Sequence, residues 1–276
     1  MLRWSFRLFK IRGIQLSVHG SFLILLAYVA FEGWQLDGWP GLGWSVALLV
    51  VFFTCVVLHE LGHSFTARVF GVGVPRILLM PIGGMAEFDR MPRRPREEFL
   101  IAIAGPAVNF VIASILFLIV GLPRNWSFWT LDDYPATARG FSQLLLHWNI
   151  WMGCFNLIPV FPMDGGRIFR ALLATMMPYL RATFWAASLG KVLALVGIGI
   201  AIFHYQAYLT AVLFSFIFFA GEAEYRAIRR REIEDAHWRE ILTRFPAQAG
   251  EPPLLIDVPP AAENRQPPII EIHEIE

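Results

Sequence analysis

Two histidines and a glutamate interrupt the apolar segment VVLHELGHSF, which covers residues 56–65. In a helix, residues four apart lie on one face, so His59 and His63 can present their imidazole nitrogens to a single ion. Glu60 projects about 100° around the helix from His59. There it can reach a water held by the metal and act as a general base without being a ligand. The H-E-x-x-H spacing therefore predicts a hydrolytic metal centre.

The location of these side chains strengthens the prediction. An ionisable residue at the centre of a spanning helix costs about 2.5–3.5 kcal/mol on insertion scales, and such residues are usually functional. The alternative is a pair of structural histidines whose nitrogens are satisfied by neighbouring carbonyls.

A zinc site of this type needs a third protein ligand and an open coordination position. Asp164, in FNLIPVFPMDGGR at residues 155–167, is the outstanding candidate. It follows the fourth apolar segment, at its cytoplasmic end, and we expect it at a depth similar to that of the two histidines. The prolines before it and the glycines after it predict a broken helix, which is tolerated at membrane depth where it lines a wet cavity. We expect Asp164 to meet the histidines around one zinc ion per chain. A helix that simply ends at proline and glycine would also explain these prolines and glycines.

The composition indicates that the elements that position these residues lie in a membrane. Of the 276 residues, 56% are hydrophobic and 16% are charged, and the mean hydropathy is +0.53, which is too apolar for an ordinary soluble domain. The formal net charge of +1 gives no reason to expect a nucleic acid or an acidic partner. Both cysteines lie in apolar runs and predict no disulfide. No small-residue cleavage site follows the first apolar run, so we expect it to remain as a span.

Six apolar segments are candidate membrane spans. The distribution of Lys and Arg orients them, because cytoplasmic loops retain positive charge. All but three of the 23 Lys and Arg residues precede the first span, lie between the second and third or between the fourth and fifth, or follow the sixth. We therefore expect an all-α multi-pass protein of the plasma or inner membrane with both termini in the cytoplasm. The spans cover roughly residues 18–31, 44–65, 99–121, 144–162, 184–203 and 207–220.

The composition changes after the last span. Residues 1–222 form the predicted transmembrane core. Residues 223–246 mix charged and apolar residues at helical spacing and predict a cytoplasmic amphipathic helix, which is either solvated or has a membrane-surface or dimerising role. Residues 247–276 are rich in proline and predict a flexible tail.

The motifs together resemble a known family. HELGH on one span, NLIPVFPMDGG on a later one and GPAVN between them resemble the site-2 protease family of intramembrane zinc metalloproteases, peptidase family M50. The resemblance covers roughly residues 1–222. Asn156, Pro159 and the DGG run that begins at Asp164 stand at the spacing of the family's pattern.

This resemblance implies a role for each residue singled out above. It implies that His59, His63 and Asp164 bind zinc and that Glu60 activates water for attack on the scissile carbonyl. It also implies that the substrate is the transmembrane helix of another membrane protein, cut near the cytoplasmic side. In the family the region around residues 78–88 forms a small membrane-associated sheet, to whose edge an unwound substrate could add a strand. An ordinary apolar loop is the alternative.

Three further polar residues have weaker interpretations. Asn156 either donates to the oxyanion or the substrate backbone, or makes a cap or a helix–helix hydrogen bond. Asn109 of GPAVN has the same alternatives, and for it a bond between helices is favoured. His19 is assigned a structural hydrogen bond and is left out of the metal site.

We expect no PDZ or CBS domain such as some relatives carry, because the stretch after Gly221 and the loop between Gly121 and Phe141 are short. Regulation would then come from the tail, a membrane partner or substrate shape.

Three other functions are less consistent with these residues. A metal transporter would need several polar sites in succession, whereas Glu60 is the one acidic residue within the six predicted spans. A di-metal oxidoreductase would need several histidine clusters, whereas the remaining histidines are scattered along the sequence. A binding protein that has lost catalysis is disfavoured because all the motif residues are present.

Overall fold

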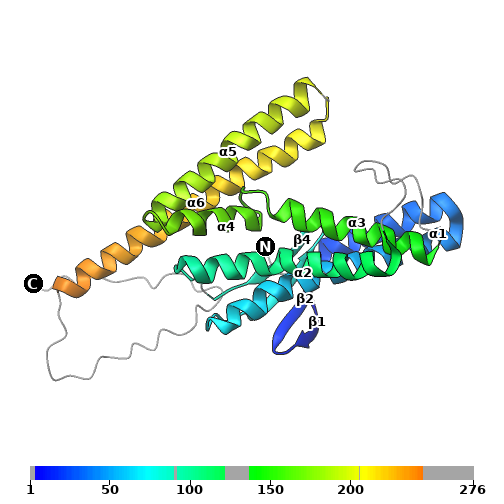
Figure 1. The fold of residues 1–276 in the computed structure, drawn as a ribbon, viewed down its shortest axis with the longest axis horizontal. Coiled ribbons are helices and arrows are strands. Elements are labelled where there is room, and N and C mark those ends of the chain that lie inside the picture. The colour runs from blue at the N-terminus through cyan, green and yellow to red at the C-terminus, as the bar shows by residue number, and fades with distance from the viewer. Residues whose placement is uncertain (1–3, 90–91, 122–136, 205, 245–276) are drawn as a thin grey trace, which may run out of the picture. The chain divides into compact units, whose positions relative to one another are not determined.

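The structure, a computed structural model, describes residues 4–89, 92–121, 137–204 and 206–244 (Figure 1). The chain forms two units, Met1–Arg230 and Arg231–Glu276. The predicted tail at residues 247–276 lies outside the described residues. The elements are β1 (Ser5–Ile11), β2 (Ile14–His19), α1 (Gly20–Val69), β3 (Arg76–Met80), β4 (Gly83–Glu87), α2 (Pro95–Val120), α3 (Ala138–Asn156), α4 (Asp164–Ala174), α5 (Tyr179–Phe203) and α6 (Tyr208–Arg244).

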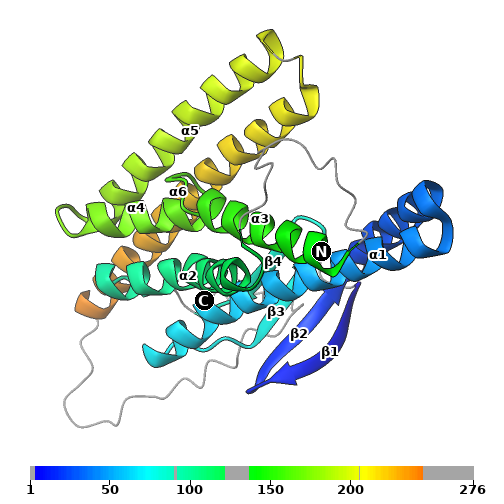
Figure 2. The same ribbon diagram turned by 45° about the vertical axis from the view of Figure 1, so that its right-hand side comes forward.

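Helix α1 is a helical hairpin that contains two of the predicted spans. Its backbone leaves the helical conformation at Asp37 and Gly38, where Gly38 has a φ of 57°, and the chain turns back there (Figure 2). The rings of Phe22 and Phe53, one on each arm, lie 4.6 Å apart between centroids. Glycine permits this turn because it lacks the Cβ that disfavours positive φ.

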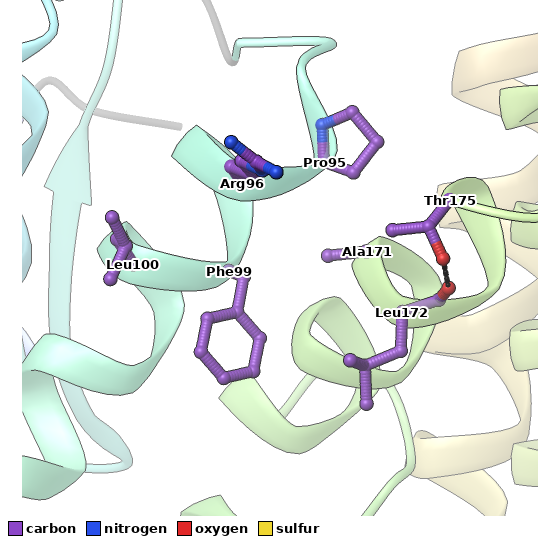
Figure 3. A pocket seen from close by; sticks show the side chains of 7 residues that line it. All are labelled: Pro95, Arg96, Phe99, Leu100, Ala171, Leu172 and Thr175. Carbon is purple, nitrogen blue, oxygen red and sulfur yellow. Dashed lines mark hydrogen bonds between the residues drawn. The ribbon is translucent and has the colours of Figure 1, made fainter.

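Helix α2 packs against α1, α3 and α4 and is therefore central to the described core. Between α2 and α4 lies an apolar pocket of about 310 Å³ (Figure 3). The hydroxyl of Thr175 lines it but already donates to the carbonyl of Leu172 at 2.7 Å. The pocket is lined by Pro95, Arg96, Phe99, Leu100, Ala171, Leu172 and Thr175.

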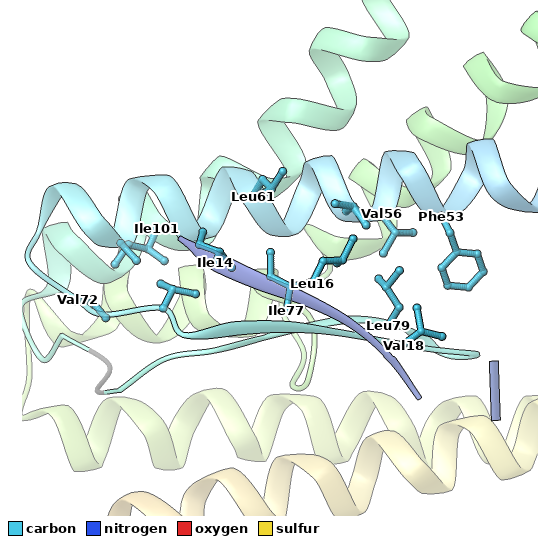
Figure 4. Packing of buried hydrophobic residues seen from close by; sticks show 13 residues of the cluster. Ile14, Leu16, Val18, Phe53, Val56, Leu61, Val72, Ile77, Leu79 and Ile101 are labelled. Carbon is cyan, nitrogen blue, oxygen red and sulfur yellow. The ribbon is translucent and has the colours of Figure 1, made fainter. Parts of the chain in front are cut away.

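The four strands form one sheet in the order β1-β2-β3-β4. Strands β2 and β3 are parallel, with α1 as the connection between them, and the outer pairs are antiparallel. One side of the sheet packs against the second arm of α1 (Figure 4). Alternate residues of a strand share a face, so Ile14, Leu16 and Val18 of β2 all reach this core. The sheet thereby holds β4 beside the helix that carries the HELGH motif.

The prediction of a mostly helical membrane protein with a small sheet at residues 78–88 is confirmed, since β3 and β4 form a hairpin there. Strands β1 and β2 were not predicted, and β2 occupies the start of the first predicted span. Three helices in the described part of the chain are long and apolar enough to cross a membrane: α1, α2 and α5. The count of six spans therefore stays a prediction. Helix α6 runs without a break through position 222, so the predicted domain boundary lies inside one helix.

Candidate metal centre

Three side chains from distant parts of the sequence meet in the core. Nε2 of His59 and Nε2 of His63, one turn apart on α1, lie 3.1 Å from each other. Oδ2 of Asp164, the first residue of α4, lies 3.2 Å from the former and 3.1 Å from the latter. All three residues are buried. The structure thus brings together the three residues that the sequence selected as ligands.

The spacing and chemistry of these atoms fit a zinc ion. Two ligand atoms at 2.0–2.1 Å from a common tetrahedral centre are about 3.3 Å apart, close to the separations here. Each histidine directs Nδ1 at an oxygen that only accepts: Oδ1 of Asn109 at 2.5 Å and the carbonyl of Ile101 at 2.7 Å. A neutral imidazole therefore carries its proton on Nδ1, which leaves a lone pair on Nε2. Three lone-pair donors this close together call for a cation between them.

Gly105 of α2 provides the space for this cluster. A Cβ atom at this position would lie 2.2 Å from Nε2 of His63 and 2.7 Å from Nε2 of His59. Gly62, inside the HELGH motif, allows the two helices to approach, because a Cβ there would lie 2.8 Å from the carbonyl oxygen of Ala104. The glycine of GPAVN is therefore a site residue that the sequence reasoning missed. Its position between two apolar runs gave no signal for this role.

The loop before α4 delivers Asp164 to the histidines. Helix α3 ends at Asn156, earlier than the predicted span end at 162, because the prolines of the loop lack a backbone donor and disfavour helix before them. Gly165 packs on this loop, and a Cβ there would lie 2.2 Å from the carbonyl oxygen of Ile158. The loop thereby presents the carboxylate of Asp164 to Nε2 of both imidazoles.

Glu60 lies beside the cluster and against the edge strand β4. Its Oε2 accepts a hydrogen bond of 3.1 Å from the backbone N–H of Ala86. A Cβ on Gly84 would lie 2.7 Å from Cγ of Glu60, so the strand approaches closely because this residue is glycine. Among the residues that the structure describes, strand β4 pairs with β3 alone, and Ala86 directs its N–H away from β3. The free edge of the sheet consequently faces Glu60.

A buried charged cluster holds α4 in place. The Arg170 guanidinium donates to Oε1 of Glu98 at 2.7 Å and to Oε1 of Glu224 at 2.6 Å, so it joins α4 to α2 and α6. It also lies over the rings of Phe161 and Tyr179, at 5.0 and 5.1 Å from their centroids. Burial lowers the pKa of Arg170, but the two carboxylates raise it above its ordinary value. The cluster was not predicted, since its members are spread over four elements.

The weaker sequence candidates occupy other positions. Asn156 is half-buried at the end of α3, and among the described residues it has no hydrogen bond to the three candidate ligands. Asn109 bonds to His59 and to Asn149 of α3, so it joins helices and also contacts a candidate ligand. His19 caps α1 by accepting from the backbone N–H of Ser21.

No second cluster competes with this one within the part of the chain that the structure describes. His59, His63 and Asp164 form the one group there of three or more His, Cys, Asp or Glu side chains that could share an ion. The apolar pocket between α2 and α4 offers no metal ligand. A single buried group weighs against a di-metal site and against a succession of transport sites.

Comparisons with known proteins point in the same direction. The model of peptidase family M50 matches residues 47–129 and 133–203. Zinc metalloprotease MJ0392 of Methanocaldococcus jannaschii is 37% identical over 246 residues, which are 89% of this chain and 68% of that protein. Stage IV sporulation protein FB of Bacillus subtilis is 28% identical over 135 residues, 49% of this chain and 43% of that protein. The solved structure of the site-2 protease from Methanocaldococcus jannaschii, at 37% identity, has a TM-score of 0.57 and covers 80% of this chain and 95% of that chain.

Proposed function

The chain belongs to peptidase family M50, the site-2 protease family, and we propose that it hydrolyses a peptide bond in or near the transmembrane helix of another membrane protein. The observation that carries the proposal is the meeting of His59, His63 and Asp164 beside Glu60. Membership of the family confirms the predictions of a zinc metalloprotease and of zinc as its cofactor. The assignment of individual residues and the nature of the substrate are our proposals.

We assign zinc to His59 and His63 through Nε2 and to Asp164 through its carboxylate. When bound there, zinc supplies Lewis acidity, which polarises a substrate carbonyl and makes water a stronger acid. Glu60 takes the proton from the attacking water and returns one to the leaving nitrogen, as a general base and then a general acid. The hydrogen bond from Ala86 leaves the other carboxylate oxygen of Glu60 for this exchange.

Strand β4 is the proposed docking edge for the substrate. A helical peptide bond is shielded by its own hydrogen bonds, so the substrate must unwind before it is cut. An unwound segment can add to the free edge of β4 and pair with its outward backbone groups. Residues two apart direct those groups the same way, so Gly84 shares the direction of Ala86. The added strand would run past Glu60, which lies against this edge.

The membrane topology and a donor to the oxyanion complete the proposed mechanism. We propose six spans in the plasma or inner membrane, with both termini in the cytoplasm and cleavage towards the cytoplasmic side, as the positions of Lys and Arg favour. Asn156 is proposed to donate to the oxyanion or to the substrate backbone. Asn156 lies half-buried at the end of α3, eight residues before Asp164 in the sequence.

Co-expression with candidate single-span membrane proteins tests the function. The native chain is expected to yield truncated product, and Glu60→Gln is expected to yield none while still binding one zinc ion per chain. Glu222→Gln, the same chemical change on α6, is the matched control and is expected to cut normally. The proposal fails if the native chain and Glu60→Gln give the same fragments. Zinc movement into vesicles that survives Glu60→Gln would instead support a transporter.

A further inference from the structure

A chain of buried hydrogen bonds leads from one candidate ligand across three helices. Nδ1 of His59 on α1 bonds to Oδ1 of Asn109 on α2 at 2.5 Å. Nδ2 of Asn109 donates to Oδ1 of Asn149 on α3 at 3.0 Å, and Nδ2 of Asn149 donates to the carbonyl of Leu145 at 2.9 Å. The two asparagines are 0% and 1% exposed. Buried amides with every polar atom engaged have little freedom to rearrange.

The direction of this amide chain is set at its far end. The carbonyl of Leu145 can only accept, so the NH2 group of Asn149 must face it. The oxygen of Asn149 then points the other way and accepts from the NH2 group of Asn109. The oxygen of Asn109 consequently faces His59, whose Nδ1 has to donate. A proton held on Nδ1 leaves Nε2 with the lone pair that a metal requires.

We infer that Asn109 and Asn149 are positioning residues that keep Nε2 of His59 free of a proton and directed at the metal. The inference rests on the proposed function, because it concerns the same zinc site. His63 differs, since its Nδ1 faces the backbone carbonyl of Ile101 at 2.7 Å. A substitution cannot reverse a carbonyl, whereas an amide side chain can rotate. The hydrogen bonds through Asn109 and Asn149 are thus the part of the site in which a substitution can exchange donor and acceptor.

Removing Asn149 frees the amide of Asn109 to turn by half a rotation. Its NH2 group could then face Nδ1 of His59, which would become the acceptor and carry its proton on Nε2 instead. That tautomer cannot bind the metal through Nε2. Loss of an outer partner of a metal-binding histidine typically costs about 10–100-fold in metal affinity.

The first test compares Asn149→Ala with the native full-length chain in detergent. The dissociation constant for zinc is measured by competition with a chelator, and binding of Co²⁺ is followed by its absorption spectrum. We expect Asn149→Ala to bind zinc about 10–100-fold more weakly. Leu146→Ala is the matched control, because Leu146 is 1% exposed on the same helix and its truncation also leaves a cavity. It is expected to lower the thermal midpoint and to leave zinc affinity within about twofold.

A rescue variant separates orientation from packing. In Asn109→Asp/Asn149→Ala the introduced carboxylate has acceptors on both oxygens, so no rotation can present a donor to His59. We expect zinc affinity and the Co²⁺ spectrum to return close to native, although the cavity left by Asn149→Ala remains. If Asn149→Ala alone does not fold, Asn109→Leu removes the acceptor facing His59 while keeping a similar side-chain volume. It is expected to weaken zinc binding by the same factor of about 10–100.

The outcomes distinguish this inference from the proposed function. Native zinc affinity in Asn149→Ala, or a double variant as weak as Asn149→Ala, overturns the amide chain and leaves the protease proposal intact. A native chain that binds no zinc overturns the proposed function itself.

Discussion

Replacing Gly105 by alanine places a methyl group among the candidate ligands. The new Cβ would lie 2.2 Å from Nε2 of His63 and 2.7 Å from Nε2 of His59, whereas ordinary van der Waals contact begins near 3.4 Å. At least one imidazole must therefore move by about 1 Å. Zinc ligand distances are held to within about 0.2 Å, so this shift is several times the tolerance of the site. We expect zinc affinity to fall on the order of 100-fold or more.

The assay is zinc binding by the purified full-length chain in detergent, with its thermal midpoint measured in parallel. Two glycine variants serve as controls. Gly62→Ala disturbs the packing of α1 on α2, since its Cβ would meet the carbonyl oxygen of Ala104 at 2.8 Å and Cγ2 of Val108 at 2.9 Å. Gly199→Ala, on α5, meets nothing within 4 Å and tests the effect of the substitution on a helix alone. Native zinc affinity in a folded Gly105→Ala protein would refute the reasoning.

Three further predictions follow from the charged groups and the metal. Arg170→Met leaves Glu98 buried without its partner and should lower the free energy of unfolding, measured by SDS titration, by about 3–5 kcal/mol. Arg170→Met/Glu98→Leu should lower it by less, because no buried charge is then left unpaired. An equal or larger loss in the double variant would contradict this account. Hydrogen bonds from Lys191 and Arg226 hold the pKa of Glu222 below its ordinary value. The ionised Glu222 carboxylate therefore stabilises the fold above the unfolded pKa of about 4.3, and this contribution is lost as pH falls through the folded pKa. The thermal midpoint of the native chain should consequently fall more steeply in acid than that of Glu222→Gln. Removing zinc with a chelator should lower the unfolding free energy by about 4 kcal/mol if zinc was present at 1,000 times its dissociation constant, and an unchanged thermal midpoint would count against a bound metal.

The pattern of ionisable residues was sufficient to select the three side chains that meet in the core. Helical geometry alone fixes His59 and His63 relative to each other, so their spacing in the sequence is enough to predict that they share one face. Asp164 was selected because few carboxylates lie at a suitable depth, which is an argument from the membrane and the distribution of charge. Neither step required a knowledge of tertiary packing.

The surroundings of these residues could not be predicted in the same way. Asn149 and Gly105 act through neighbours on other helices, and one sequence does not tell which faces of two helices meet. Strand β2 was within reach of the sequence, because Ile14, Leu16 and Val18 alternate with polar residues at a period of two. Hydropathy over a longer window merged it with the span that follows. The Arg170 cluster joins residues of four elements, which no local pattern encodes.

The parts of the candidate site are far apart along the chain, so the ribosome synthesises them at different times. His63 and Asp164 are separated by 101 residues. At a translation rate of about 5–20 residues per second, roughly 5–20 seconds pass between the synthesis of the two. During that interval the nascent chain has the HELGH helix but only two of the three proposed zinc ligands, so we expect it to be inactive. Competence to cut would arrive only after α4 has emerged and docked, which protects neighbouring membrane proteins from a half-built enzyme.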